Sequence, residues 1–417
     1  MEEKRSSDGK YLSGFLTGVL GTLIVVLVAL IIVIMVFGNI FISKNNVGIV
    51  NVEKNEELDE SMDYITQKVE YLAGFISTYY LEEVDTEDII EGIYKGIFES
   101  IGDPYSEYYT KDEYVKLLES TNGEFVGIGV SIIKDETGEL IVTGFLDGSN
   151  AEKVGMKVDD IIVKVDGKDI TKIDYDEVIS MIRGDVGTTV KIGVLRKVDG
   201  KNKEMEFDVP RAVVSDISVY SKMEDNDIGY IYITSFDTNT PQQFEKHLKE
   251  LQKQGMKGLI LDIRYNGGGT LDAVQAIADV IMDEGILLTM KDKSGETKKV
   301  VETEDGKLID VPIVVLVNEY SASASEVLAA AVKDRDVGEI VGVTTFGKGI
   351  VQTIIPLNDG SAIKITTERY YTPNGDYIHE KGVTPDYVVE LDSENANEGV
   401  DTQFEKAKEV LGKMMEK

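Results

Sequence analysis

Three serines alternate with alanines in the stretch NEYSASASEVLAAAVKD, residues 318–334, directly before a run with helical periodicity. Ser323 and Glu326 have the S-x-x-E spacing of a capping box, which would make the serine a helix cap. A serine ahead of a helix also has backbone N–H groups and the positive end of the helix dipole beside it. Both would stabilise an oxyanion during nucleophilic attack. The local pattern leaves the two interpretations open.

A nucleophilic serine needs a partner that accepts its proton. His247 lies in a charged amphipathic helix pattern and His379 in a turn-like stretch expected at the surface, so neither suits a Ser-His-Asp triad. The chain has no cysteine, which excludes cysteine nucleophiles, disulfides and thiolate metal sites. Lys348 is a candidate base if burial depresses its pKa enough to leave a neutral amine. The neighbouring Phe346, Ile350 and glycines suit a partly buried site.

Two further stretches carry residues that could take part in chemistry. YNGGG, residues 265–269, ends a strand pattern and could supply a second backbone N–H to an oxyanion. SAIK, residues 361–364, fits the S-x-x-K spacing of penicillin-binding enzymes. It lies in a strand pattern rather than on a helix and lacks the S-D-N and K-T-G partners, so we set it aside.

The elements that would position these residues alternate between strand and helix from residue 213 to residue 395. Strands such as GLILDI and IVVLV are apolar on both faces, as expected for strands that helices cover on both sides. The sequence therefore predicts an α/β domain, whose functional residues should gather at the carboxyl ends of its strands.

Residues 119–212 change to a period of two, with short strands separated by Gly/Asp turns and one amphipathic helix, DYDEVISMIRG. This pattern predicts a small, partly open β-barrel, and it resembles a PDZ domain. Gly127, Ile128, Gly129 and Val130 stand where that family binds a peptide's C-terminal carboxylate while the peptide adds as a strand. Asn150 and Asp159 depart from the usual proline and glycine, away from this loop.

Residues 11–38 are apolar throughout and carry no charge. They exceed the roughly 20 residues that span a bilayer, and no small-residue cleavage pattern follows, so we expect an uncleaved single-pass anchor. Lys4, Arg5 and Lys10 precede the segment, which predicts a cytoplasmic tail at 1–10 and an extracytoplasmic catalytic part. The predicted anchor thus places the protein in a cell membrane.

Composition and the remaining segments complete the organisation. A formal net charge of −33 disfavours nucleic acid as a partner. We predict a stalk or linker at 39–60, a helical segment at 61–118 and a C-terminal helix at 396–417. Apolar helices directly after an anchor would pack on the main body or on a second copy.

Taken together, the stretches outside the anchor resemble the carboxyl-terminal processing proteases, also called tail-specific proteases, which are known from bacteria. NEYSASASE matches the serine motif of this family, TFGKGIVQT its lysine motif and LDIRYNGGG its glycine strand. GDPYSEYYTKDEY, the PDZ-like segment and RYYTPNGDYI…GVTPD match in the same order. The family usually has a glutamine-containing stretch where this chain has YIHEKG.

The resemblance implies an inserted PDZ domain, an α/β core of the ClpP/crotonase type and a Ser-Lys dyad. The family's serine lies 25 positions before its lysine, which selects Ser323 as the partner of Lys348. Its glutamine corresponds to Gln352, and four residues of straight strand would hold Gln352 roughly 13 Å from Lys348. The implied oxyanion donors are the N–H groups of Ala324 and of Gly268 or Gly269. Arg183 is a candidate coupling residue, with an ordinary helix-end cation as its alternative.

The sequence therefore predicts a membrane-anchored serine endopeptidase that needs neither metal nor cofactor. Its expected partners are protein substrates with exposed C-termini, with a second copy and a regulatory protein as further candidates. The competing interpretation is a non-catalytic PDZ receptor with a degenerate hydrolase core. It predicts a serine that only caps its helix.

Overall fold

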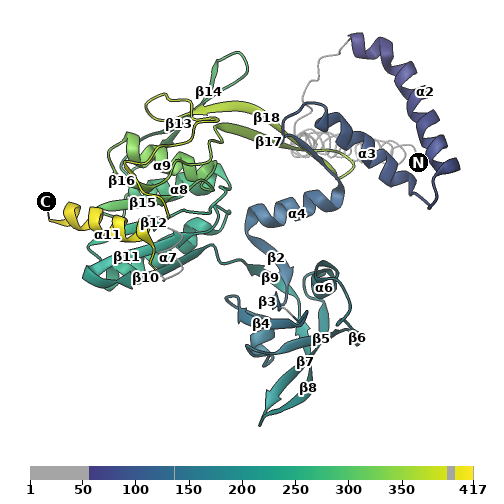
Figure 1. Ribbon diagram of the computed structural model, residues 1–417, viewed down its shortest axis with the longest axis horizontal. Coiled ribbons are helices and arrows are strands. Elements are labelled where there is room, and N and C mark those ends of the chain that lie inside the picture. Colours follow the sequence, from purple (N-terminus) through teal and green to yellow (C-terminus); the bar gives the residue numbers. More distant parts are fainter. Residues whose placement is uncertain (1–55, 136, 392–399, 417) are drawn as a thin grey trace, which may run out of the picture. The chain divides into compact units, whose positions relative to one another are not determined.

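The computed structural model describes residues 56–135, 137–391 and 400–416 (Figure 1). The chain separates into two compact units, residues 1–110 with 354–364, and residues 111–353 with 365–417. Among the described residues, no helix is both long enough and apolar enough to cross a membrane. The predicted anchor, residues 11–38, lies outside the described part of the chain.

The described part of the first unit contains two helices, a short strand and the tip of a β-hairpin. The elements are α2 (Glu56–Tyr79), α3 (Thr86–Glu99) and β1 (Glu107–Tyr109). β1 pairs antiparallel with residues 362–364, so the segment 61–118 is not helical throughout as the sequence pattern suggested. α2 also begins at Glu56, inside the stretch expected to be a stalk.

The PDZ-like segment follows α4 (Lys111–Asn122), and the antiparallel pair β2 (Glu124–Gly127) and β9 (Ala212–Ser215) joins its two ends. Its main sheet has the order β3-β4-β5-β7-β8, with β6 paired to β5. The bounds are β3 (Val130–Lys134), β4 (Leu140–Phe145), β5 (Ile161–Val165), β6 (Lys168–Asp169), β7 (Thr189–Val198), β8 (Lys201–Pro210), α5 (Asn150–Lys153) and α6 (Tyr175–Ile182). The predicted helix is α6, and β3 lies at the sheet edge.

The α/β core is built on a six-stranded sheet of order β10-β11-β12-β15-β16-β19. Its strands are β10 (Val219–Glu224), β11 (Ile228–Ile233), β12 (Gly258–Asp262), β15 (Ile313–Val317), β16 (Gly338–Gly342) and β19 (Tyr387–Val388). The five strands β11, β12, β15, β16 and β19 are parallel to one another, and β10 is antiparallel to β11. Every residue of β12 and β15 is buried, as their two-sided apolar pattern predicts.

Helices cover both faces of this sheet (Figure 1). One face carries α7 (Thr240–Lys253), α8 (Leu271–Ile281) and α9 (Ala324–Asp334), and the other carries α11 (Thr402–Met415). Alternate residues of β15 face the two helical layers. Val315 and Val317 belong to the apolar cluster with α7, α8 and α9, whereas Val314 and Leu316 pack with side chains of α11. This packing fixes where β15 ends and α9 begins, which is where the serines lie.

A second, antiparallel sheet was not anticipated from the sequence. It comprises β13 (Gly285–Lys291), β14 (Thr297–Thr303), β17 (Ile350–Pro356) and β18 (Ala362–Tyr371), in addition to β1. β17 starts two residues after Lys348 and pairs with β18. The predicted lysine loop therefore leads directly into this second sheet. The strict strand–helix alternation expected for residues 213–395 is therefore interrupted.

Candidate active site

The three alternating serines have different environments. Ser321 and Ser325 are fully buried, and their hydroxyls donate to main-chain carbonyls, Ser321 Oγ to Ile263 at 2.9 Å and Ser325 Oγ to Asn266 at 2.8 Å. Ser323, between them, is only half-buried and stands at the N-cap position of α9. Of the three side chains, that of Ser323 is therefore the one a substrate can reach.

Ser323 also has an unusual backbone. Its φ of 55° and ψ of −113° lie in a region that residues with a Cβ seldom occupy, at a cost of about 1–3 kcal/mol. Strained strand-to-helix turns present the nucleophile of α/β-hydrolases, although this chain lacks their G-x-S-x-G motif. The N-cap residue of an ordinary capping box has extended backbone angles, so capping alone does not require the strain at Ser323.

The Glu326 carboxylate joins the serine turn to the lysine loop. It is fully buried, and Oε2 accepts the N–H of Ser323 at 2.9 Å and that of Lys348 at 2.7 Å. Oε1 accepts the Thr345 hydroxyl at 2.6 Å and the Gly347 N–H at 2.7 Å. Hydrogen bonds to an ionised carboxylate are about twice as strong as neutral ones, so this residue holds both loops in one arrangement.

Tyr370 on β18 provides a second link between the same two loops. Its buried hydroxyl donates to the carbonyls of Lys348 and Ser323, with O···O distances of 2.6 and 3.3 Å. Burial and the nearby Glu326 carboxylate hold the pKa of Tyr370 well above its ordinary value, so the phenol stays protonated and remains a donor. Ser323 and Lys348 are thus tied together through both their N–H and their C=O groups.

The lysine loop is packed main chain against main chain. A Cβ on Gly347 would lie 3.0 Å from Lys381 N, and one on Gly349 would lie 2.7 Å from His379 N. Both positions therefore require glycine. Lys348, which lies between them, is half-buried. The predicted apolar surroundings are only half right, because Ile350 is buried whereas the Phe346 side chain is 55% exposed.

His379 is not the plain surface residue that its turn-like sequence suggested. Its backbone packs against Gly349 of the lysine loop, and its side chain is partly buried. Nδ1 is enclosed without a hydrogen-bond partner among the described residues. The predicted surface position of His379 is wrong because the turn that contains it packs on the lysine loop instead of projecting into solvent.

The glycine turn lies directly against the serine. A Cβ on Gly268 would come within 2.8 Å of Ser323 Cβ and 3.1 Å of Ala324 N, so only a glycine fits there. As the first residue of α9, Ala324 has an N–H without an intrahelical partner. The Gly268 N–H, in contrast, donates to Asn266 Oδ1 at 2.9 Å. Gly269 packs on Phe236, where a Cβ would lie 2.3 Å from the carbonyl oxygen.

Gln352 lies within β17, and Lys348 precedes that strand, so the two residues do not share one straight strand. The Gln352 amide donates to Thr366 Oγ1 on β18 at 3.3 Å. Its predicted role in orienting Lys348 remains a prediction.

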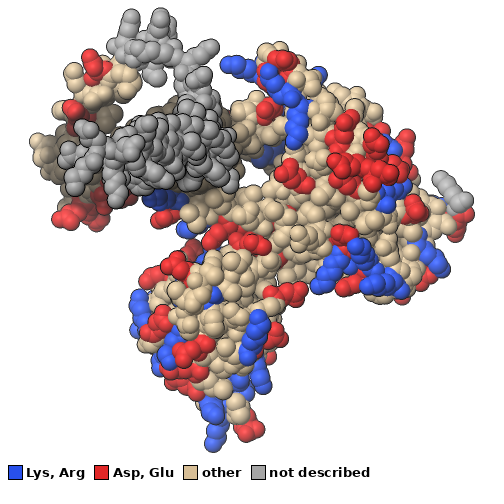
Figure 2. All heavy atoms as spheres, turned by 180° about the vertical axis from the view of Figure 1, so that it is seen from behind, with Lys and Arg blue, Asp and Glu red and all other residues tan. Residues whose placement is uncertain are grey.

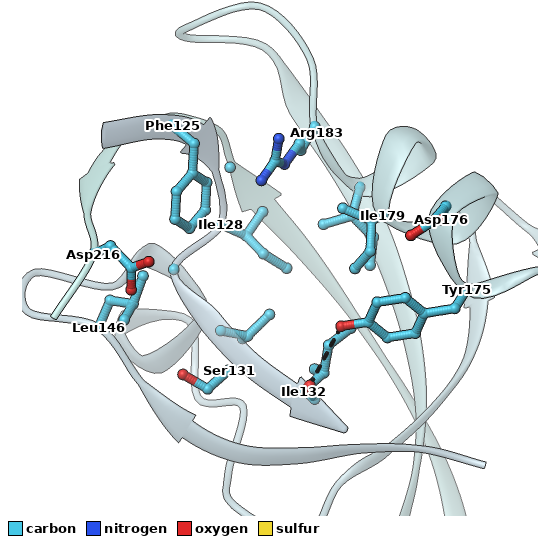
Figure 3. A pocket seen from close by; sticks show the side chains of 14 residues that line it. Phe125, Ile128, Ser131, Ile132, Leu146, Tyr175, Asp176, Ile179, Arg183 and Asp216 are labelled. Carbon is cyan, nitrogen blue, oxygen red and sulfur yellow. Dashed lines mark hydrogen bonds between the residues drawn. The ribbon is translucent and has the colours of Figure 1, made fainter. Parts of the chain in front are cut away.

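The PDZ-like segment contains a cavity of about 540 Å³ at the predicted carboxylate loop (Figure 3). Gly127, Ile128, Gly129 and Val130 all line it. Gly129 has a φ of 78° and a Cβ there would lie 2.9 Å from the Ser149 main chain, so this position requires glycine. The remaining apolar lining comes mainly from Leu146, Ile179 and Ile182.

Arg183 closes one end of this cavity (Figure 3). Its guanidinium lies 4.9 Å from the centre of the Phe125 ring and forms a 2.9 Å ion pair with Glu119 on α4. Arg183 therefore connects this cavity to α4, the helix that precedes the PDZ-like segment. Its environment differs from that of a cation placed only near helix-end carbonyls.

Other candidate side chains have structural partners. Lys364 of the S-x-x-K stretch lies beside Glu107 and Tyr109; burial opposes the effect, but hydrogen bonds to these groups raise the pKa of Lys364 and keep it charged. His247 Nδ1 lies 2.7 Å from Ser221 Oγ of β10. Within the described ranges, no group of acidic and histidine side chains is spaced to hold a metal ion.

Sequence reasoning did not identify several residues that shape this site. Asn266 and Asn318 are buried, and each lies just beyond the end of a core strand. Asn318 Oδ1 accepts the N–H groups of Tyr265 and Tyr320, at 2.9 and 3.2 Å. Polar residues shortly after buried parallel strands were the available signal. Tyr370 lies on β18, which the sequence predicts as a strand but whose place beside the serine and lysine loops no local pattern indicated.

A serine in a strained turn, a lysine loop tied to it and a PDZ-like module define the class of protein, a serine-type peptidase with a PDZ domain. Models of three families match the chain. Peptidase family S41 matches residues 227–389, the PDZ domain family 141–196 and the Activating protease CtpB N-terminal domain 33–113.

Two relatives from Bacillus subtilis (strain 168) extend the match to most of the chain. Carboxy-terminal processing protease CtpA is 35% identical over 76% of this chain and 67% of its own length. Carboxy-terminal processing protease CtpB is 34% identical over 81% and 69%. The chain belongs to the carboxy-terminal processing protease family. A solved photosystem II D1 C-terminal processing protease is 30% identical, with a TM-score of 0.45 over 76% of this chain and 86% of that one.

Proposed function

We propose that this protein is an endopeptidase that uses Ser323 and Lys348 as a catalytic dyad. Ser323 Oγ attacks a peptide carbonyl carbon, and the neutral Lys348 amine accepts the hydroxyl proton. The same proton then passes to the leaving amine, and water hydrolyses the acyl-enzyme. The observation that carries the proposal is the single Glu326 carboxylate that receives the N–H groups of both residues, which fixes the two loops together.

The proposed oxyanion site consists of the Ala324 N–H and a donor from the glycine turn. Close packing of Gly268 against Ser323 and Ala324 supports this placement. The hydrogen bond from Gly268 N to Asn266 Oδ1 must lengthen or become shared before this N–H can bind an oxyanion. We therefore infer that the described arrangement is a resting one, in which the second donor is occupied.

We propose that the PDZ domain binds the C-terminus of a protein substrate. An extended peptide would pair with the edge strand β3, and its last side chain would enter the cavity between Ile128, Leu146 and Ile179. This lining favours an apolar C-terminal residue. The carboxylate would meet the main-chain N–H groups of the loop around Gly129.

Arg183 is our proposed link between peptide binding and the active site. Its partner Glu119 lies on α4, and at the end of that helix Asn239 Nδ2 donates to the Gly123 carbonyl at 2.8 Å. Asn239 precedes α7, three residues after Phe236, whose N–H donates to the Gly268 carbonyl at 2.9 Å. These contacts support a path along which an occupied PDZ cavity could release the glycine turn.

The setting of the protein is proposed from its sequence. An anchor at 11–38 would hold it in a cell membrane with the peptidase outside the cytoplasm.

Exposed apolar side chains on α2, among them Tyr71 and Phe75, suit self-association, and a regulatory partner remains a candidate. The face in Figure 2 carries both acidic and basic side chains, and the net charge of −33 disfavours a nucleic-acid partner.

Digestion of matched substrates tests this function. Wild type and Ser323→Ala are each incubated with an unfolded protein that ends in a free apolar C-terminus and with the same protein amidated there. We expect wild type to cleave the free form at least tenfold faster, and Ser323→Ala to cleave neither. Binding of the free tail without cleavage by wild type would favour the non-catalytic receptor, and equal cleavage of both forms would contradict C-terminal recognition.

A further inference from the structure

Four tyrosines lie along one edge of the core sheet, at the amino end of β10 and at or just beyond the carboxyl ends of β11, β12 and β15, and the proposed function assigns none of them a role. Tyr220 on β10 pairs directly with Tyr232 on β11, and their ring centres are 6.4 Å apart. Tyr265 follows β12 and Tyr320 follows β15, and these two rings stack at 5.5 Å with an angle of 20°. We call Tyr220, Tyr232, Tyr265 and Tyr320 the tyrosine row.

The strands that carry the two pairs are neighbours in the sheet. Tyr232 is in register with Asp262 at the end of β12, and Tyr265 follows three residues later. The row thus crosses four adjacent strands, a width of about 14 Å at the usual strand spacing.

The inner end of the row reaches the proposed catalytic site. Tyr320 lies three residues before Ser323 and Tyr265 three residues before Gly268, so each is within roughly 11 Å along the chain. Both rings are 56% exposed even though they stack on each other. An exposed aromatic surface that continues into the nucleophile turn is placed to contact whatever the nucleophile attacks.

The exposed rings of Tyr265 and Tyr320 are held by a strained backbone conformation at Tyr265. Tyr265 has a φ of 60°, a conformation that is rare for a bulky side chain. The side-chain oxygen Oδ1 of the buried Asn318 accepts the N–H groups of both Tyr265 and Tyr320, which fixes the two loops at one separation. A strained tyrosine that is kept exposed beside a second exposed ring by a buried side chain indicates a role in binding rather than in folding.

The occupant follows from the chemistry of the rings. Tyrosine faces contact apolar side chains and main-chain amides of many sequences at a low conformational cost, which suits an unfolded polypeptide. An extended chain advances about 3.3 Å per residue, so four or five residues would cover the row. A folded partner is less suited to a strip only one ring wide.

We propose that the tyrosine row is the binding track along which an unfolded polypeptide substrate reaches Ser323, with its apolar side chains resting on the rings. This assignment rests on the proposed peptidase function and names the subsite that would select segments containing apolar residues near the scissile bond. Recognition here is separate from recognition of the C-terminus by the PDZ cavity.

Peptide binding without cleavage tests the track. The probe is an unstructured, fluorescein-labelled 12-residue peptide with leucine at alternate positions and an amidated C-terminus, which removes the carboxylate that the PDZ loop would bind. Its Kd is measured by anisotropy in the Ser323→Ala protein. We expect Tyr265→Asn with Tyr320→Ser to raise Kd at least tenfold, since asparagine tolerates a positive φ. Tyr220→Ser at the outer end should raise Kd about threefold.

Controls separate ring contacts from structure. Tyr265→Phe with Tyr320→Phe should keep Kd within twofold, as should Tyr387→Ser on β19, at the opposite edge of the same sheet. An unchanged Kd in both Tyr265→Asn/Tyr320→Ser and Tyr220→Ser would overturn the track, and so would an equal loss in the phenylalanine variant. If the peptide binds as expected but wild type cleaves neither the free nor the amidated form of the unfolded protein substrate, the proposed peptidase function fails while the track stands.

Discussion

At the scale of single residues, the site depends on a carboxylate that never needs to touch substrate. Glu326 binds four donors from the serine turn and the lysine loop while fully buried. The capping-box spacing identified it in the sequence, but only as a partner of Ser323. Its bonds to Lys348 and Gly347 depend on the fold, because residues 22 positions away in sequence have no pattern that relates them.

Glu326→Gln should lower both activity and stability. An amide presents an NH₂ group to at least one of the N–H donors, which leaves a buried donor unsatisfied at a cost of about 2–4 kcal/mol. We expect kcat to fall at least 100-fold with a smaller change in KM, because the two reacting groups lose their relative position. Cleavage kinetics and urea unfolding measure the two effects.

Glu319→Gln is the matched control, since Glu319 is exposed in the same loop. It should change neither kcat nor the urea midpoint appreciably. If Glu326→Gln kept full kcat, the carboxylate would not hold the dyad.

At the scale of elements, two strand ends and one helix start converge on Ser323. Gly268 has a φ of 110° and no room for a Cβ, whereas Gly267 has open space around it. Sequence reasoning could not say which glycine of the run faces the serine, because three consecutive glycines look alike until a neighbouring loop is placed.

Gly268→Ala and Gly267→Ala should therefore behave differently. The added Cβ at Gly268 would push against Ser323 Cβ and the Ala322 carbonyl, so we expect activity to fall at least 100-fold and stability by about 2 kcal/mol or more. Gly267→Ala keeps its backbone N–H and should retain activity within about fivefold. Parallel assays of the two variants decide the matter, and equal activities would contradict the placement of the glycine turn.

The C-terminal helix is attached to the core by a partly exposed ion pair that should respond to pH. Arg264 NH2 lies 2.7 Å from Asp262 and 2.8 Å from Asp401, the N-cap residue of α11. Burial alone would raise the pKa of Asp401, but the Arg264 guanidinium and the Phe404 N–H hold it below its ordinary value. The stabilisation is therefore present above the pKa of unfolded aspartate, near 4, and is lost as the pH falls through the lower folded value.

Asp401→Asn should destabilise the protein at pH 7 by about 1–2 kcal/mol, since the partly exposed pair is screened by solvent. The difference from wild type should shrink as the pH falls below 4. Chemical unfolding at pH 7 and pH 3 checks this, with Asp310→Asn, an almost fully exposed aspartate, as the control. A constant difference at both pH values would mean that the charge of Asp401 does not matter.

At the scale of the whole molecule, the order of the segments was the most predictable feature. Period-two and buried-strand patterns located the PDZ domain and the parallel sheet, because local hydrophobic periodicity reflects which faces are covered. The antiparallel sheet of β13, β14, β17 and β18 was missed, since its pairing depends on contacts between distant residues. The partly buried His379 was misjudged for the same reason.

The PDZ cavity should confer a preference for apolar C-termini that its lining explains. Ile179→Asp would place a charge in the cavity floor, so we expect a peptide ending in alanine or valine to bind at least tenfold more weakly. Anisotropy with free and amidated peptides measures this. Lys134→Asp at the far end of β3 serves as the control. Equal binding of free and amidated peptides by wild type would contradict carboxylate recognition.

The central claim, that Ser323 is a nucleophile activated by Lys348, is tested most directly by covalent labelling. An alkyl fluorophosphonate is reacted with wild type and with Lys348→Ala, and peptide mass mapping locates the adduct. We predict one adduct on Ser323 in wild type, formed at least 100-fold more slowly in Lys348→Ala. An adduct on Ser321 or Ser325, or a labelling rate that does not depend on Lys348, would contradict the dyad.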